Sequence, residues 1–474
     1  MADGPVLDLP VRRDEAVLGV LRRRAAPARR LRSEVPTTTV RDTGTHTGTH
    51  VGTHVGTVTP ARLRRLLDGD EEVAVLDVRD PVARAAGHLV RSAPAPLHDL
   101  ERRARGLVPR LGTVVVVASD PALDDQAAAI LAGLGYERVH VLEGGLDAWR
   151  ACGGRTYAGT HVLGTALGEW IRTTSVDAGA GVDDVRARAR QTLEAAGVER
   201  VDAAGLARLV ADPTRTTYVV DVRGPAEHAA GHVPGSLHVP GDRLVRAVEE
   251  HLAVRRAHVV IVDDADLLRS AATVARLRHL HDGPVHVHVH DGAAAPVPVP
   301  VPDVPVVDAV TGHEMAAMLR ARVVSVVDLR SSAAYAAGHV GGSVHARREQ
   351  LPSLLPGLSS PVVLVGDDDL VPDFIAAEAD RLLGGRGDVH ILEGGIDAFP
   401  GNLTTADPSY AGPVVDRAGP PPSGPEGDAW HRARAAWAAG LLAAVAAAGD
   451  PDLDFDAGAL GQSTSIRGLQ PVRP

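Results

Sequence analysis

Short runs of apolar, largely β-branched residues recur along the chain, and segments with apolar residues three or four positions apart lie between them. The runs cover residues 73–76, 217–220 and 324–327, and a second set covers residues 114–117, 259–262 and 362–365. Because the runs scarcely alternate with polar residues, they are typical of parallel strands that are covered by helices on both faces. The segments between them, such as 124–136, have the spacing of amphipathic helices. The pattern predicts an α/β fold.

One signature follows the first run of each pair. The run ends in Asp-Val-Arg or Asp-Leu-Arg, and a Gly-His pair comes next. The distance from the aspartate to the histidine is the same in all three copies, as the pairs Asp77 and His88, Asp221 and His232, and Asp328 and His339 show. A fixed internal period is the mark of a repeated structural unit. We therefore predict three modules in tandem, each a small mainly parallel sheet with helices on both faces.

The composition between the copies sets the predicted boundaries. The modules cover residues 57–155, 200–292 and 305–402. The other segments are a flexible N-terminal arm with GTHx repeats (1–56), a helical linker (156–199), a Pro-rich linker (293–304), a Pro/Gly linker (403–427) and a C-terminal helix with a tail (428–474). Since Trp430, Trp437, Leu441 and Val445 fall on one helix face, we expect this helix to dock on the modules or on a second subunit.

Charge and cysteine content exclude several classes of protein. The net charge of −11 argues against a nucleic-acid binder, which needs a basic surface. The single cysteine, Cys152, excludes an intramolecular disulfide, a cysteine-based zinc site and an iron–sulfur cluster. The most apolar stretch, residues 435–448, is shorter than the ~20 residues of a membrane span. We expect a cytoplasmic protein without a cofactor, a membrane contact or a nucleic-acid partner.

The motifs taken together resemble those of the rhodanese-like sulfurtransferases. They are Asp-Val-Arg, then Gly-His-Val-Pro-Gly-Ser at 231–236, then Leu-Glu-Gly-Gly-Leu-Asp-Ala-Trp at 142–149. The tandem arrangement is similar to the multi-domain rhodanese-related sulfurtransferases of bacteria, and the likeness covers about three-fifths of the chain. It implies that the motif residues hold the fold. These residues are Asp77, Arg79, His88, Asp221, Arg223, His232, Asp328, Arg330 and His339.

The resemblance also implies a catalytic cysteine, and this sequence lacks it. In the family the cysteine opens the loop after the central strand, at a helix N-terminus that lowers the thiol pKa and cradles an anion. Here the corresponding positions are Ala118, Asp264 and Gly366, with the adjacent Ser119, Asp263 and Asp367 as alternatives. All three loops are rich in aspartate, which suits a helix N-terminus and repels thiosulfate.

Three functions remain open at this point. The first is a catalytically degenerate protein that acts as a binding, scaffold or regulatory module in sulfur metabolism, with a protein partner in sulfur transfer. The second is an active thiosulfate sulfurtransferase that uses Cys152 or a cysteine-bearing partner. The third is metal binding by His286, His288 and His290, which share one strand face, or by the histidines of the GTHx repeat. A solvent-facing strand and a low-complexity linker are the ordinary interpretations of these histidines. The spacer at 155–200 also suggests that an active module has been lost there.

Overall fold

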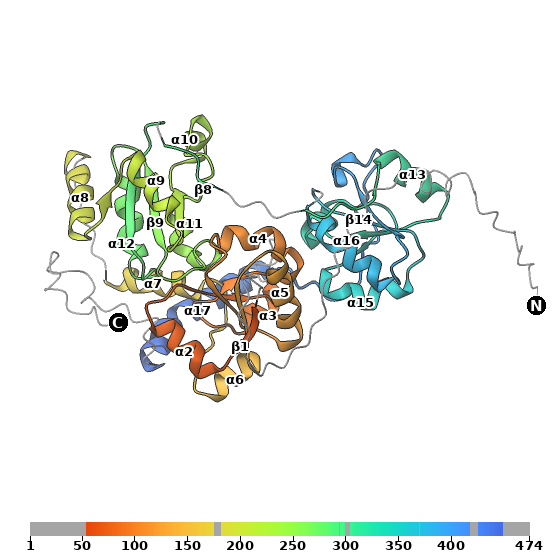
Figure 1. Cartoon of the computed structure of the whole chain (residues 1–474), viewed down its shortest axis with the longest axis horizontal. Helices are drawn as coiled ribbons and strands as arrows, with labels where there is room; N and C mark the ends of the chain where they lie inside the picture. Colours follow the sequence, from red (N-terminus) through yellow and green to blue (C-terminus); the bar gives the residue numbers. More distant parts are fainter. Residues whose placement is uncertain are drawn as a thin grey trace, which may run out of the picture. The chain divides into compact units, whose positions relative to one another are not determined.

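The computed structural model describes residues 54–174, 182–292, 294–298, 304–368, 370–417 and 425–448. The chain divides into two compact units (Figure 1). One unit is the third module, Pro305–Gly412. The other contains the first two modules and the C-terminal helix. Each unit is described by itself.

The first module is a five-stranded sheet in the order β1-β5-β4-β2-β3, with every neighbouring pair parallel. Its strands are β1 (His54–Val58), β2 (Val73–Asp77), β3 (Ala93–Pro94), β4 (Val114–Val117) and β5 (Arg138–Leu142). Its helices are α2 (Pro60–Asp68), α3 (Pro81–Ala86), α4 (Leu100–Leu107), α5 (Pro121–Gly133) and α6 (Gly145–Ala151). The strand β1 begins three residues before the boundary predicted at residue 57, so the end of the predicted arm belongs to the sheet.

The second module repeats this topology, with the order β6-β10-β9-β7-β8 and parallel pairing throughout. Its strands are β6 (Glu199–Arg200), β7 (Thr217–Asp221), β8 (Leu237–His238), β9 (His258–Asp263) and β10 (Val285–Val289). Its helices are α9 (Ala203–Ala211), α10 (Pro225–Ala230), α11 (Gly241–Arg246), the 3₁₀ helix η2 (Val248–Glu250) and α12 (Leu268–Leu277). The identical strand order confirms the α/β repeat.

The third module has the same five strands and one more, in the order β11-β15-β14-β12-β13-β16. The strands are β11 (Ala309–Val310), β12 (Ser325–Asp328), β13 (Val344–His345), β14 (Val362–Val365), β15 (Val389–Leu392) and β16 (Ser409–Tyr410). The helices are α13 (Gly312–Arg320), α14 (Ser332–Ala337), α15 (Leu351–Leu354) and α16 (Leu370–Leu382). The strand β16 lies in the segment predicted as a Pro/Gly linker and extends the sheet beyond β13.

The central strands are buried on both faces, as their composition requires. Val73 and Val75 of β2 lie in one apolar cluster, while Ala74 and Leu76 lie in another on the opposite face. This alternation is the period-two geometry of a strand. Burying one such side chain stabilises a fold by about 1.5–3 kcal/mol. A continuous valine run therefore serves as the core of each sheet.

The first two modules share one core. Tyr218 of β7 is buried and donates its hydroxyl hydrogen to the carbonyl of Leu107 in α4. The buried carboxylate of Glu72 accepts hydrogen bonds from the backbone and the hydroxyl of Thr216, at 2.8 and 2.9 Å. An antiparallel bridge joins Ala74 to Val254. The two modules consequently form a single packed body.

Two linker helices and the C-terminal helix complete this unit. They are α7 (Val162–Thr174), α8 (Val182–Ala195) and α17 (Pro425–Ala448). The helix α17 packs against α7, and Leu441 on its inner face is buried. Gly159 has φ +109°, and a Cβ there would lie 2.5 Å from the Trp437 ring, so only glycine fits. The helix thus docks on its own unit. None of the helices described is long and apolar enough to cross a membrane.

Candidate functional site

Each module contains the same ion pair at the carboxyl end of its second strand. In the first module Arg79 donates from Nε and Nη2 to the two oxygens of Asp77, at 2.9 and 2.6 Å, and from Nη2 to the Gly87 carbonyl at 2.8 Å. The pairs Arg223–Asp221 and Arg330–Asp328 repeat this geometry, with the carbonyls of Gly231 and Gly338 as the third acceptor. Such two-pronged bonds fix a guanidinium in one orientation. The arginine thereby ties the strand to the Gly-His loop.

The first of these aspartates is held by a second arginine. Arg84 is buried and donates from Nη1 to Asp77 Oδ2 at 3.2 Å and to the Ser92 hydroxyl at 2.7 Å. Burial alone would raise the pKa of Asp77, but the hydrogen bond of Arg79 and the charges of both arginines outweigh it and hold the pKa below its ordinary value. In the second module His228 takes the place of Arg84 beside Asp221.

The signature histidines bind backbone one helical turn upstream. Nδ1 of His88 lies 3.1 Å from the Arg84 carbonyl, and His232 and His339 make the matching contacts at 3.0 Å with the carbonyls of residues 228 and 335. Burial, with the nearby charge of Arg84, lowers the pKa of His88 to about 3. The ring is therefore neutral near pH 7, which suits a structural contact better than proton transfer.

The sheet register aligns the three loops after the central strands. Asp221 and Asp328 pair with Val262 and Val365, and the same register places Ala118 beside Asp77. Ala118 is therefore equivalent to Val262 and Val365. The carbonyls of the next residues in the first and third loops, Ser119 and Gly366, accept matching backbone hydrogen bonds from Leu146 and Ile396.

Among the positions assigned from the sequence, Ser119, Asp263 and Gly366 are equivalent in this alignment, whereas Ala118, Asp264 and Gly366 are not. Gly366 lies one residue beyond the equivalent of Ala118, and Asp264 lies two residues beyond it. The second loop is longer than the first, and the sequence alone does not show where the extra residues lie. Ser270 stands seven positions after Asp263, whereas Asp124 stands five positions after Ser119. A Cβ on Gly366 would also lie 2.4 Å from the Asp368 carbonyl oxygen, so this position has no room for a side chain.

In the first loop a carboxylate from the chain binds the loop N–H. Asp124 lies in the first turn of α5 and is fully buried. Its Oδ2 accepts from the backbone N–H of Ser119 at 3.0 Å, and its Oδ1 accepts from the Ser119 hydroxyl. A helix N-terminus attracts an anion. Here that anion is the protein's own carboxylate.

In the second loop the aspartate and the serine of this contact exchange places. Asp263 now stands at the strand end, where it is fully buried, and accepts from the N–H of Ser270 at 2.7 Å and from its hydroxyl at 3.0 Å. Arg269 donates to Asp263 at 3.1 Å and binds both oxygens of Glu227, at 2.8 and 2.9 Å. These bonds close the loop on itself. The sequence showed the aspartates but gave no sign of the serine and arginine that they bind.

Comparisons with known proteins agree with this geometry. A model of the rhodanese-like domain matches residues 59–152, 202–294 and 311–401, more than half of the chain. The chain belongs to the rhodanese-like family. It is 33% identical over 96 residues to the thiosulfate sulfurtransferase GlpE of Pseudomonas entomophila, covering 20% of this chain and 84% of GlpE. It is 29% identical over 218 residues to SseB of Mycobacterium tuberculosis, covering 40% of this chain and 71% of SseB.

A solved structure extends the likeness to the tandem arrangement. The thiosulfate sulfurtransferase of Pseudomonas aeruginosa superposes with a TM-score of 0.75 at 26% identity, covering 83% of this chain and 98% of that chain. The family and the α/β tandem fold expected from the motifs are confirmed.

The thiol of this rhodanese-like chain lies away from all three loops in sequence. Cys152 is exposed and follows the last residue of α6. Its N–H donates to the Ala148 carbonyl at 3.1 Å. A helix stabilises an anion at its N-terminus, and Cys152 stands at the opposite end. The position lacks the anion-binding environment that the loops have.

The histidines of β10, His286 and His288, and His290 directly after the strand have separate surroundings. Nε2 of His286 lies 2.9 Å from Nδ1 of His258, and the two rings stack. Nδ1 of His288 lies 3.0 Å from the Val201 carbonyl. His290 donates its backbone N–H to the Asp263 carbonyl. His288 is buried, so this face of the strand is covered. The expectation of a solvent-facing strand is wrong here. Among the residues described, no group of three or more His, Cys, Asp or Glu side chains is placed to hold a metal ion. Two histidines of the GTHx repeat, His46 and His50, lie outside the described residues.

The carboxyl of Asp124 gives the first loop a pH dependence. Burial raises its pKa to about 6, although the hydrogen bonds from Ser119 oppose the shift. An acid whose pKa is raised by folding destabilises the fold when it ionises, so stability is lost as the pH rises from its ordinary pKa through 6. We expect Asp124→Asn to become more stable relative to the wild type by about 2–3 kcal/mol between about pH 4 and about pH 7. Urea unfolding at several pH values measures this difference. A difference that stays constant with pH would contradict the prediction.

Proposed function

We propose that this rhodanese-like protein does not transfer sulfur through its own modules and acts instead by binding a small molecule or a partner protein in sulfur metabolism. The observation that carries the proposal is the Asp124 carboxylate on the Ser119 N–H and hydroxyl. Sulfur transfer in this family needs a thiolate at the loop and a free set of N–H donors for an anionic donor. The first loop has alanine at the position of the thiolate and a carboxylate on its donors.

The other two loops support the same proposal in different ways. Asp263 repeats the internal carboxylate in the second loop, and Arg269 and Glu227 close it. In the third loop Val365 stands at the position equivalent to Ala118, and Gly366 after it leaves no room for a side chain. The chain has one cysteine, and it is in none of the loops. The single thiol is also compatible with the reducing cytoplasm, where we place the protein.

A second candidate is a thiosulfate sulfurtransferase that uses Cys152 or a thiol of a partner protein. The exposure of Cys152 favours it, because a persulfide carrier must be accessible to its donor and acceptor. In this reaction the thiolate attacks the outer sulfur of thiosulfate, the S–S bond breaks and sulfite leaves. Cyanide then takes the sulfur as thiocyanate and restores the thiolate.

Intact-protein mass spectrometry separates the two candidates. The purified protein is measured before and after thiosulfate, then after cyanide, with Cys152→Ser alongside. We expect no added sulfur in either protein, while a rhodanese with a loop cysteine, treated in parallel, gains one sulfur atom. A sulfur on the wild type that cyanide removes and that Cys152→Ser lacks would establish Cys152 as a carrier.

The partner-dependent form needs one further step. The chain is mixed with a rhodanese that already carries a persulfide, and the sulfur on each protein is followed. Transfer to Cys152 would overturn the proposal.

A further inference from the structure

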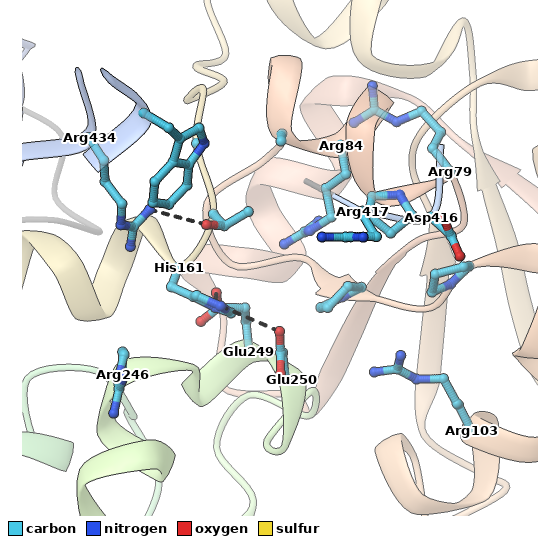
Figure 2. Close-up of a pocket in the computed structure, with 17 residues that line it drawn as sticks. Arg79, Arg84, Arg103, His161, Arg246, Glu249, Glu250, Asp416, Arg417 and Arg434 are labelled. Carbon is cyan, nitrogen blue, oxygen red and sulfur yellow. Dashed lines mark hydrogen bonds and ion pairs between the residues drawn. The ribbon is translucent and has the colours of Figure 1, made fainter. Parts of the chain in front are cut away.

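A cavity of about 700 Å³ opens within the unit formed by the first two modules and α17 (Figure 2). The first module contributes the segments around α3 and β3 and Arg103 of α4, and the second contributes η2 and the end of α11. The remainder comes from residues 159–161, which precede α7, from residues 416–417 and from α17. The volume is that of a pocket for a small molecule. None of the three rhodanese loops lines it.

Arginines from several separate segments surround this cavity. They are Arg79, Arg84, Arg103, Arg246, Arg417 and Arg434, and they exceed the lining carboxylates Glu249, Glu250 and Asp416 by three. Figure 2 shows them around the cavity, with His161 and the two glutamates between them. All 49 lysine and arginine positions of the chain are arginine, which explains runs of arginine along the sequence. It does not explain why arginines from distant segments meet at one cavity. Asp77, which binds Arg79 and Arg84, and Asp242, which binds Arg246, offset two of these positive charges. The cavity stays net positive and is partly enclosed, which favours an anion.

The arginines differ in how far the protein already uses them. Arg84 is bound to Asp77 and Ser92, and Arg434 donates to Thr160 at 3.3 Å and covers the Trp430 ring at 5.6 Å. Arg103 makes no hydrogen bond or ion pair with any residue that the structure describes. A guanidinium presents a planar fork of donors that matches a phosphate. Arg103 is therefore the side chain most able to bind an incoming anion.

A buried carboxylate in the same cavity offers an acceptor. Glu249 is 6% exposed; its Oε1 lies 3.3 Å from His161 Nδ1, and its Oε2 has no hydrogen-bond partner. The hydrogen bond that His161 donates to Glu249 raises the pKa of His161 above its ordinary value despite burial. His161 has φ +54°, a left-handed backbone that costs energy for this residue and directs the ring into the cavity. An unpaired buried oxygen is costly, and a hydroxyl or amino group of a ligand would satisfy it.

We propose that this cavity binds a phosphorylated small molecule, with the phosphate on the arginines around Arg103 and a hydroxyl group on Glu249. Nucleoside phosphates and sugar phosphates share this chemistry, and both fit the volume. Thiosulfate has no group that could donate to Glu249. The site depends on residues 159–161, residues 416–417 and α17, which lie outside the matched rhodanese domains. This inference rests on the proposed binding role and gives that role a class of ligand. Separate experiments test the two.

Isothermal titration calorimetry of the full chain at low salt tests the site. The probes are ADP, ribose 5-phosphate, inorganic phosphate and adenosine. We expect one or both phosphate esters to bind, inorganic phosphate to bind at least about tenfold more weakly, and adenosine not to bind. Arg103→Gln should weaken binding of the ester by about tenfold or more. Arg102→Gln is the matched control, because Arg102 is the neighbouring exposed residue of α4 and does not line the cavity.

Each other outcome overturns the proposal. Absence of binding by both esters excludes the ligand class, and equal binding of inorganic phosphate excludes a role for the hydroxyl acceptor. Equal weakening by Arg102→Gln and Arg103→Gln would show a general charge effect in place of a site. Thermal unfolding of both variants confirms that they are folded. Arg102→Gln loses one ion pair, with Asp99 one helical turn away. A sulfur adduct in the mass-spectrometry experiment would leave these results unchanged.

Discussion

Replacing Asp77 with alanine is expected to lower the free energy of unfolding of the two-module unit by about 3–5 kcal/mol. The carboxylate is fully buried and binds Arg79 and Arg84. Its removal leaves two guanidinium groups next to each other without their counter-charge, and Arg84 is itself buried. Breaking a buried pair from one side is costly because the remaining charge stays out of water.

The second module supplies a matched control for this variant. Asp221 has the same strand position, but it binds one arginine, Arg223, and the ring of His228. Asp221→Ala leaves one guanidinium without its counter-charge where Asp77→Ala leaves two, so we expect a smaller loss of stability. Urea unfolding followed by tryptophan fluorescence measures both variants. Equal losses would show that the second arginine adds nothing to the effect.

A cysteine at position 118 is expected to form a persulfide at least about tenfold faster when the carboxylate of Asp124 is also removed. In a Cys152→Ser background, Ala118→Cys/Asp124→Ser should take up one sulfur from thiosulfate and release it to cyanide. Ala118→Cys alone should react at least about tenfold more slowly, because burial and the adjacent carboxylate raise a thiol pKa and each pKa unit lowers the thiolate fraction about tenfold. Asp124 would also repel the anionic donor.

The next residue of α5 provides the control for the double variant. Asp125 is exposed, so Ala118→Cys/Asp125→Ser removes the same charge from the helix but leaves the Ser119–Asp124 contact in place. The uptake of sulfur is followed by intact mass. If the single variant reacts as fast as Ala118→Cys/Asp124→Ser, the internal carboxylate is not what prevents the chemistry.

The elements of each module follow from local patterns in the sequence. The valine runs and the Asp-Val-Arg signature predict the strands β2, β7 and β12 and the turn after them, because burial and the Asp–Arg pair both act within a few residues. The strand β16 could not be predicted, since Ser409 and Tyr410 have no apolar run and pair with β13 through backbone groups. A strand of this kind depends on what lies beside it.

The candidate site likewise combines features that the sequence shows with contacts that it does not show. The absence of a loop cysteine is visible in the sequence, and so are the aspartates. The bond between Asp124 and Ser119 needs the helix geometry that brings residues five apart together. The cavity around Arg103 and Glu249 joins residues far apart in the chain, and a single sequence holds no signal for such a convergence. Contacts between distant segments are what the structure adds.

The common core of the first two modules limits how this gene can change. Recombination that deleted the first module would uncover Tyr218 and Val254, both of which are buried against it. Exposed apolar surface of this kind promotes aggregation, so selection would remove such a deletion. We therefore expect the first two copies to be kept as a pair. The third copy has its own core and is the one free to be exchanged between genes.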